Sequence, residues 1–594
     1  MINALTRAFA LGAAGGVTVM SALVAPSSSA PGDPPVVKTT HGPVQGVTEA
    51  GLHVFRGVPY AAPPVGEFRF RPPAAPKPWS EPLRATEFGP ACVQKYDEME
   101  VEEGGRISED CLTLNVWSGS LNGPANPVIV FIHGGGFTSG AASNPWYDGA
   151  GLARRGVTVV SIQYRVGPFG WLDMSELGPR YARSMNNGLL DQMTALRWVR
   201  DNIAAFGGDP HNVTVTGESA GAISISALMG VPAADDLYDR AILQSGTAGT
   251  VATRQWAADV AGKFTELAGV GSREGILGLS AEQVLATAEK LYDSQFSDTA
   301  FHPVVDGDLL PRLPAERIAS SDGPAKPVVI GTTLDEARYW LYYIPELLRL
   351  PRSYWQPWLE SLVGDRADET FDAYRKQRPG LTDGQIGIAI VGDVGFRMPA
   401  IRMAEAFAAR GVDTRMYLAT VPSIAFDGAM GSPHAVELPF VFGTTAAASA
   451  FVADSDANRA LSDQVQNLWV SFARGGQVGS ATTTWPLYDT KNRSTLILDT
   501  NLRVENDPYP ETRKVWGDMT FDGAHPGLDR ITPLQFEGTN PYDLRVLAAV
   551  VGWGPIAGGG AALLVIVAAV VGLLAHRRRK RLAVGQQVAE PALW

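Results

Sequence analysis

A serine flanked by small residues is the first candidate for chemistry in this chain. Gly217-Glu218-Ser219-Ala220-Gly221 follows the β-branched run Val213–Thr216 and precedes the apolar run Ala222–Ile225, so a G-x-S-x-G pattern stands between a predicted strand and a predicted helix. This context is typical of a nucleophile elbow, a tight turn that leaves the serine hydroxyl exposed above a sheet. The amino terminus of the following helix would favour negative charge that develops there. The pattern therefore predicts nucleophilic catalysis by Ser219.

A glycine-rich segment is a second, independent candidate. His133-Gly134-Gly135-Gly136-Phe137 comes directly after the apolar run Val128–Ile132. Attack on an acyl carbon produces an oxyanion, which backbone N–H groups can stabilise, and glycines let the backbone approach it closely. We expect Gly135, Gly136 and Ala220 to supply these N–H groups. A phosphate-binding loop is the alternative, but the segment lacks both the Lys-Ser/Thr and the G-x-G-x-x-G patterns of nucleotide sites.

A serine hydroxyl needs a base, and the base needs an orienting acid, which in folds with this elbow comes between the serine and the histidine in sequence. The histidines after Ser219 are His302, His434, His525 and His576. His302 precedes any good acid candidate, and His576 adjoins a basic run. We prefer His434, which follows Gly431-Ser432-Pro433, to His525 in its Gly/Pro-rich loop. For the acid, Asp335-Glu336 closely follows the buried run Val328–Ile330, and a carboxylate just past a strand end suits an active-site rim.

Short strands and helices must position these residues. Val128–Ile132, Thr158–Ile162 and Val213–Thr216 have the pattern of buried strands. Leu189–Ile203 has apolar residues at helical spacing, and Gly207-Gly208-Asp209-Pro210 should break that helix. The alternation predicts an α/β fold with a large, mostly parallel central sheet and helices on both faces.

Domain organisation follows from what is missing along the chain. No long Ser/Pro linker or fixed-period repeat divides residues 35–540. Length alone would suggest several domains, but we predict one large catalytic domain over residues 31–545.

Composition excludes several classes of protein. The 594 residues carry a formal net charge of −12, with 45% hydrophobic and 19% charged residues, as in a folded globular protein. An acidic balance argues against a nucleic-acid partner, which would require a basic face. With Cys92 and Cys111 as its two cysteines, the chain has neither a disulfide scaffold nor a four-cysteine zinc site. The serine chemistry predicted above needs no metal or organic cofactor.

The N-terminal residues have the order of a secretory signal peptide. Arg7 is followed by the apolar stretch Ala8–Ala25 and then by Ser-Ser-Ser-Ala, with Ala30 at a small-residue cleavage position. We therefore predict a cleaved signal peptide over residues 1–30; an uncleaved signal anchor is the alternative. Because thiols tend to oxidise outside the cytoplasm, Cys92 and Cys111 could close a disulfide loop that contributes about 3 kcal/mol, although two free buried thiols are also possible.

The C-terminal residues predict a membrane anchor. Residues 546–575 contain no charged side chain, and the apolar core Ile556–Ala575 is long enough to cross a hydrocarbon layer of about 30 Å as a helix. Arg577, Arg578, Arg579, Lys580 and Arg581 follow, and such a basic block stays on the cytoplasmic side. We predict an exported, single-pass membrane protein with an extracytoplasmic catalytic domain and a cytoplasmic tail over residues 576–594. A buried core helix is the alternative for the apolar stretch.

The chain resembles the type-B carboxylesterase/cholinesterase family of α/β-hydrolases. The resemblance runs from about Val36 to Asp489 and is specific because many motifs occur in order. These are FRGVPYA at 55–61, SEDCL at 108–112, HGGGF at 133–137, FGGDP at 206–210, GESAG at 217–221, QSG at 244–246, FHPVVDG at 301–307, Asp335-Glu336, and His434 with ELPFVFG at 437–443.

The resemblance implies a role for each candidate residue. Ser219 would be the nucleophile, Glu336 the acid and His434 the base, with Gly135, Gly136 and Ala220 at the oxyanion. Ala337 replaces the glycine that usually follows the acid. Glu218 resembles a residue that modulates the active-site field and Glu437 its water-linked partner, although both could be structural acids. Cys92 and Cys111 match the first disulfide of the family.

The family also suggests two functions. Hydrolysis of small-molecule carboxylic esters is the first, and a non-catalytic, neuroligin-like binding ectodomain is the second. Hydrolysis is favoured because Ser219, Glu336 and His434 are all present. Cholinesterases hold a quaternary ammonium with a tryptophan in the first cysteine loop, but no tryptophan lies between Cys92 and Cys111. Choline esters are therefore not expected as preferred substrates.

Overall fold

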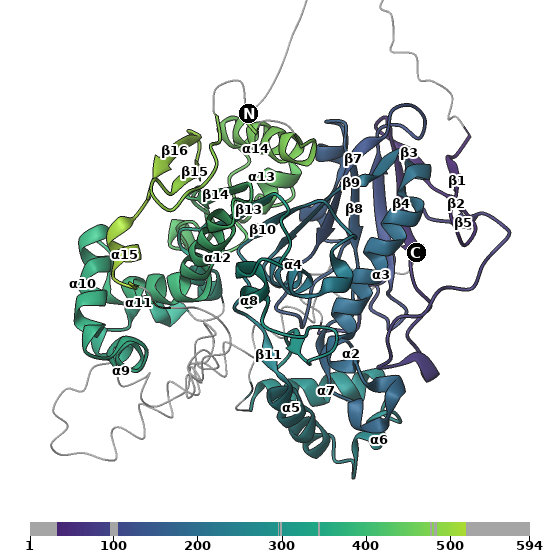
Figure 1. Cartoon of the computed structure of the whole chain (residues 1–594), viewed down its shortest axis with the longest axis horizontal. Helices are drawn as coiled ribbons and strands as arrows, with labels where there is room; N and C mark the ends of the chain where they lie inside the picture. Colours follow the sequence, from purple (N-terminus) through teal and green to yellow (C-terminus); the bar gives the residue numbers. More distant parts are fainter. Residues whose placement is uncertain are drawn as a thin grey trace, which may run out of the picture.

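A computed structural model describes residues 33–519, apart from 96–104, 295, 297–299, 343–344, 476–477, 480–483 and 518. Strands and helices alternate along most of this stretch (Figure 1). The predicted signal peptide, membrane segment (546–575) and basic tail lie outside the described residues. Within the described ranges, no helix has both the length and the apolar character needed to cross a bilayer.

A large mixed sheet forms the centre of the molecule. From edge to edge its strands are β16 (Arg503–Asn506), β15 (Ser494–Leu498), β14 (Thr414–Ala419), β13 (Val328–Thr333), β10 (Arg240–Gln244), β9 (Gly208–Glu218), β7 (Asn126–Ile132), β8 (Thr158–Ile162), β6 (Thr113–Ser118), β4 (Leu52–Pro59) and β3 (Val47–Glu49). All neighbouring strands from β15 to β8 pair in parallel, and antiparallel strands extend the sheet at both edges. The predicted mostly parallel sheet is thus confirmed.

Small sheets and helices complete the fold. A three-stranded sheet contains β1 (Val36–Lys38), β2 (Pro43–Gln45) and β5 (Leu83–Arg84), and β11 (Ala252–Thr253) pairs with β12 (Val304–Val305). The α-helices are α1 (Ala150–Ala153), α2 (Gly167–Trp171), α3 (Asn187–Asn202), α4 (Ala220–Gly230), α5 (Arg254–Leu267), α6 (Arg273–Ile276), α7 (Ala281–Tyr292), α8 (Pro314–Ala319), α9 (Arg352–Val363), α10 (Ala367–Gln377), α11 (Asp383–Gly392), α12 (Met398–Ala409), α13 (Leu438–Phe442), α14 (Asp456–Ala473) and α15 (Pro510–Lys514).

Helices cover both faces of the sheet. Side chains of a strand point alternately to its two faces, and in β7 Val130 and Ile132 join one apolar cluster while Ile129 and Phe131 join the other. The first cluster contains buried residues of α3, α4 and α12, and the second contains those of α13 and α14. The strands between the two layers are nearly continuous apolar runs because both of their faces are buried.

The predicted elements are present, most of them with shifted boundaries. The predicted strand 158–162 is β8 without change, and the predicted helix 189–203 is α3, which begins two residues earlier. A 3-10 turn extends that helix to Phe206, and Gly207 ends it in a left-handed conformation. The strand predicted at 213–216 is longer, since β9 already pairs with β7 from Gly208, across an irregularity between Asn126 and Val128.

The parallel strands bring the candidate residues to one edge of the sheet. Ser219 and Ser245 directly follow the carboxyl ends of β9 and β10, and Gly134 and Glu336 lie shortly after those of β7 and β13. β14 leads into the segment that carries His434. Carboxyl ends of neighbouring parallel strands meet at the same edge, where open α/β sheets bind their ligands.

Candidate active site

Ser219 lies at a strained turn between β9 and α4. Its φ of 53° is unusual for a residue with a side chain, and its backbone N–H donates to the Gln244 carbonyl (2.9 Å). The Ser219 carbonyl accepts from the Ile223 N–H (2.9 Å), which starts α4 directly behind the serine. Since Ala220 is the first residue of α4, its N–H is among the donors that a helix leaves without an intrahelical partner.

The glycine-rich loop lies against this turn. A Cβ atom on Gly134 would come within 3.0 Å of the Ser219 Cβ and 2.7 Å of Glu218 Oε2, so glycine is needed for this close approach. Gly135 and Gly136 have positive φ angles of 101° and 58°. The loop therefore places backbone groups beside the serine in conformations that suit glycine.

His434 and Glu336 form a buried pair. His434 Nδ1 lies 2.6 Å from Glu336 Oε2, and the two residues are 5% and 1% exposed. The other carboxylate oxygen, Oε1, accepts from the Thr333 N–H (2.7 Å) and from the Ser245 hydroxyl (2.7 Å). Two donors thus fix Glu336, whose Oε2 accepts the proton carried by His434 Nδ1.

A second carboxylate faces the other ring nitrogen of His434. Glu218 Oε1 lies 3.0 Å from His434 Nε2, and Glu218 directly precedes Ser219, so this edge of the imidazole faces the elbow. Burial lowers the pKa of His434, but the charges of Glu218 and Glu336 outweigh burial and hold the pKa well above its ordinary value. The arrangement favours a protonated imidazole once a proton has arrived.

Glu437 is the third buried glutamate of this group. Its Oε1 accepts from the Tyr417 hydroxyl (2.9 Å) and from the Gln244 side-chain amide (3.3 Å). Burial, together with the charges of Glu218 and Glu336, raises the pKa of Glu437 to about 7. The site thus contains an acid that changes its charge near neutral pH.

The acid and histidine segments are joined through their backbones. The Asp335 N–H donates to the Ser432 carbonyl (2.8 Å), and the His434 N–H donates to the Glu336 carbonyl (3.3 Å). The Asp335 carboxylate accepts from the Ser432 N–H (3.1 Å) and pairs with Arg378 (2.8 Å) of the short segment after α10. These bonds hold the acid segment beside the histidine segment, although the two are distant in sequence.

Aromatic rings enclose the imidazole. The ring centroids of Phe396, Trp340 and Tyr339 lie 5.0, 5.5 and 5.8 Å from that of His434. Phe396 belongs to a single π-helical turn, Asp393–Arg397, between α11 and α12. Such turns are rare and often occur at functional sites because they redirect side chains. The rings shape an apolar wall beside the histidine.

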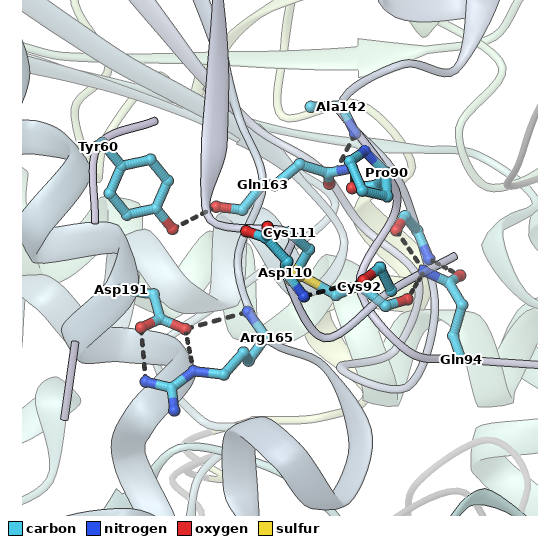
Figure 2. The surroundings of a disulfide bond; sticks show 12 residues. Tyr60, Pro90, Cys92, Gln94, Asp110, Cys111, Ala142, Gln163, Arg165 and Asp191 are labelled. Carbon is cyan, nitrogen blue, oxygen red and sulfur yellow. Dashed lines mark hydrogen bonds and ion pairs between the residues drawn. A yellow bond between two sulfur atoms is a disulfide. The ribbon is translucent and has the colours of Figure 1, made fainter. Parts of the chain in front are cut away.

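The structure separates the histidine candidates. His434 lies beside Glu336 and the elbow, whereas the His302 ring packs edge-on against Phe137 of the glycine-rich loop (5.4 Å between centroids). His525, like His576, lies outside the described residues. Cys92 and Cys111 form a disulfide bond, as predicted (Figure 2).

Several residues around the site have roles that the sequence did not reveal. Ser245, Tyr417 and Phe396 contact Glu336, Glu437 and His434 respectively. Ser245 belongs to the QSG motif, which was a visible signal without an assigned role. Tyr417 lies in an ordinary strand pattern, and Phe396 in an apolar helical run, so neither residue differs in sequence from a core residue.

Comparison with known proteins agrees with this geometry. The sequence pattern of the carboxylesterase family matches residues 33–516. The para-nitrobenzyl esterase of Bacillus subtilis is 39% identical over 81% of this chain and 98% of its own, and the phenmedipham hydrolase of Pseudarthrobacter oxydans is 34% identical over 80% and 97%. The crystal structure of a carboxylesterase from Geobacillus stearothermophilus superposes with a TM-score of 0.74 at 35% identity, covering 81% of this chain and 99% of that one. The chain therefore belongs to the carboxylesterase family.

Proposed function

We propose that the protein hydrolyses carboxylic esters through an acyl-enzyme, with Ser219 as nucleophile, His434 as base and Glu336 as orienting acid. The observation that carries this proposal is the short bond between His434 Nδ1 and Glu336 Oε2 (2.6 Å), in a ring whose other nitrogen faces the elbow. A serine hydroxyl is a weak nucleophile at neutral pH and needs such a base.

In the acylation step, Ser219 Oγ attacks the ester carbonyl carbon while His434 Nε2 takes the hydroxyl proton. Glu336 keeps Nδ1 protonated and stabilises the imidazolium that forms. The Gly135, Gly136 and Ala220 N–H groups would donate to the oxyanion, a contribution that for a single donor amounts to roughly 10²- to 10³-fold in rate. His434 then gives its proton to the departing alcohol.

Water completes the cycle. His434 removes a proton from the water as it attacks the acyl carbon, and the serine leaves with that proton. Glu218 stabilises the charged imidazole in both halves of the reaction, because its carboxylate lies 3.0 Å from Nε2. Phe396, Trp340 and Tyr339 would exclude bulk water and accept an apolar part of the ester.

The binding-ectodomain alternative is not favoured. This chain matches the para-nitrobenzyl esterase and the phenmedipham hydrolase over nearly the full length of each relative, and both relatives carry the names of hydrolytic enzymes. In addition, the described residues keep a serine at a strained elbow and a buried His–Glu pair in place. An adhesion protein would have no need to keep either.

We further propose that the enzyme is exported and anchored by its C-terminal segment. The support is in the sequence: a leader-like stretch over residues 1–30, an apolar stretch of membrane length at 556–575, and a basic block at 577–581. The Cys92–Cys111 bond is compatible with an oxidising compartment.

Replacement of the serine tests the proposed reaction. We expect Ser219→Ala to reduce kcat for p-nitrophenyl butyrate by at least about 10⁴-fold while the protein keeps its thermal transition, since the hydroxyl supplies the covalent step. Ser224→Ala, in the next helical turn, is the matched control and should remain active. If Ser219→Ala retains parental activity, the assignment is wrong.

A further inference from the structure

A buried glutamine links the disulfide segment to the glycine-rich loop. Gln94 is 2% exposed and lies two residues after Cys92. Its Oε1 accepts from the Gly140 N–H (2.8 Å), and its Nε2 donates to the Gly140 carbonyl (2.9 Å) and to the Cys92 carbonyl (3.0 Å). One side chain thus holds both backbone groups of Gly140.

Gly140 closes the loop that begins at Gly134. Within the loop, the Thr138 and Ser139 N–H groups donate to the Gly135 carbonyl (3.0 and 2.9 Å). Gly140 has a φ of +107°, and a Cβ on it would lie 2.3 Å from His133 Nδ1. The loop is therefore compact, and it is fixed by β7 at one end and by Gln94 at the other.

A second glutamine acts in parallel beside the disulfide. The Ala142 N–H donates to Gln163 Oε1 (3.0 Å), while Gln163 Nε2 donates to the Pro90 carbonyl (3.3 Å) (Figure 2). Both glutamines thus connect the segment around Cys92 to the end of the glycine-rich loop. The Cys92–Cys111 bond fixes that segment to Cys111, two residues before β6.

We propose that Gln94 is a positioning residue for the oxyanion, because its amide, anchored by the Cys92–Cys111 disulfide segment, fixes the loop that carries the Gly135 and Gly136 N–H groups. This inference rests on the proposed hydrolytic function. Gln94 does not touch the substrate; it acts through Gly140.

The expected consequence is a loss in turnover rather than in substrate binding. Oxyanion donors act on the charge that forms in the transition state, so a displaced donor lowers kcat and leaves KM nearly unchanged. A misplacement of about 1 Å can reduce the rate by about 100-fold. Loosening one end of the loop should therefore have an effect between about 10- and 100-fold.

Gln94→Met tests the proposal because methionine keeps the length of the side chain and removes its hydrogen bonds. We expect kcat for p-nitrophenyl butyrate to fall by about 10- to 100-fold with KM within about threefold of the parent. The inhibition constant of a trifluoromethyl ketone, which forms an oxyanion on the serine, should rise by a similar factor. The matched control is Gln466→Met, since Gln466 is also buried (3% exposed) but bonds Ser462 and Arg155 instead.

Amide hydrogen exchange gives a readout that does not depend on activity. A peptide covering residues 133–142 should exchange faster in Gln94→Met than in the parent, with peptides of α14 unchanged. Replacing both Cys92 and Cys111 by serine should lower kcat in the parent. In Gln94→Met the same replacement should lower kcat further by less than about twofold, because the effects of coupled changes are not additive.

The proposal is overturned if Gln94→Met turns over within about twofold of the parent, if the loss lies in KM, if Gln466→Met loses the same turnover, or if loop exchange is unchanged. An inactive parent would instead overturn the proposed function, and hydrogen exchange would still test the role of Gln94 in holding the loop.

Discussion

His434 takes its properties from the carboxylates at its two ring nitrogens. Glu336 lies at Nδ1 (2.6 Å) and Glu218 at Nε2 (3.0 Å), and their charges raise the histidine pKa against the effect of burial. A base with a raised pKa stays protonated, and so inactive, up to a higher pH. Activity should therefore fall as pH decreases through this pKa.

Glu218→Gln should move the acidic limb of the pH profile to lower pH. The substitution keeps the shape of the side chain and removes one of the two charges that favour the imidazolium, so the pKa of His434 falls. The measurement is kcat/KM against pH, with Glu282→Gln as an exposed control that should leave the limb in place. An unmoved limb, or one shifted upwards, would contradict the electrostatic account.

Among single residues of the site, the sequence predicts those whose chemistry requires a local sequence pattern. GESAG and HGGGF could be identified because an elbow and an oxyanion loop each need small residues at fixed spacing. Gln94 could not, because its meaning depends on contact with Gly140, a residue 46 positions away. Tyr417 likewise gains its role from Glu437, across a tertiary contact.

Among the elements, a buried ion pair joins the segment before α2 to α3. Arg165, just before α2, donates to Asp191 of α3 through Nε (2.8 Å), Nη2 (2.7 Å) and its backbone N–H (3.1 Å). The side chains are 3% and 0% exposed. Burial raises the pKa of Asp191, although Arg165 opposes this shift. Removing one partner of this ion pair should therefore lower the free energy of unfolding.

Asp191→Asn should destabilise the protein by about 3–5 kcal/mol, because it leaves the Arg165 guanidinium buried without its counter-charge. The comparison is Asp308→Asn, which breaks the exposed pair with Arg183 (43% and 60% exposed) and should cost less than about 1 kcal/mol. Urea denaturation of both variants gives the two free energies of unfolding. Equal losses in the free energy of unfolding of the two variants would show that burial does not determine how much an ion pair contributes to stability.

Element types were easier to predict than their boundaries. Apolar runs identified β7 and β8 because burial on both faces of the sheet leaves a strong pattern, and apolar residues at helical spacing identified α3. The start of β9 at Gly208 was missed, since residues 208–212 contain Gly, Asp and Pro and pair with β7 only across an irregularity. The π-helical turn at 393–397 has no propensity signal of its own.

For the whole molecule, one sheet gathers residues from nearly the full described length. Parallel order brings the carboxyl ends of β7, β9, β10 and β13 to one edge, although these strands lie far apart in the sequence, from β7 at Asn126–Ile132 to β13 at Val328–Thr333. Resemblance to a family could anticipate this assembly, whereas periodicity alone gave the α/β class. The net charge of −12 includes the basic block at 577–581, so the rest of the chain is more acidic than the total suggests.

The proposed anchor predicts a difference between two lengths of the chain. The full chain should sediment with membranes and require detergent for release, because a 20-residue apolar helix inserts almost irreversibly. A chain that ends at residue 545 should be secreted as an active enzyme. The measurement is esterase activity in membrane and soluble fractions; recovery of both forms in the soluble fraction would contradict the anchor.

The most direct test of the central claim is labelling of the purified protein with a fluorophosphonate, followed by peptide mass spectrometry. Such probes react covalently with an activated serine and not with an ordinary hydroxyl. The account predicts one adduct per chain on the peptide that contains Ser219, and its loss in Ser219→Ala and in His434→Ala. Labelling on another serine, or undiminished labelling of Ser219 in His434→Ala, would contradict it.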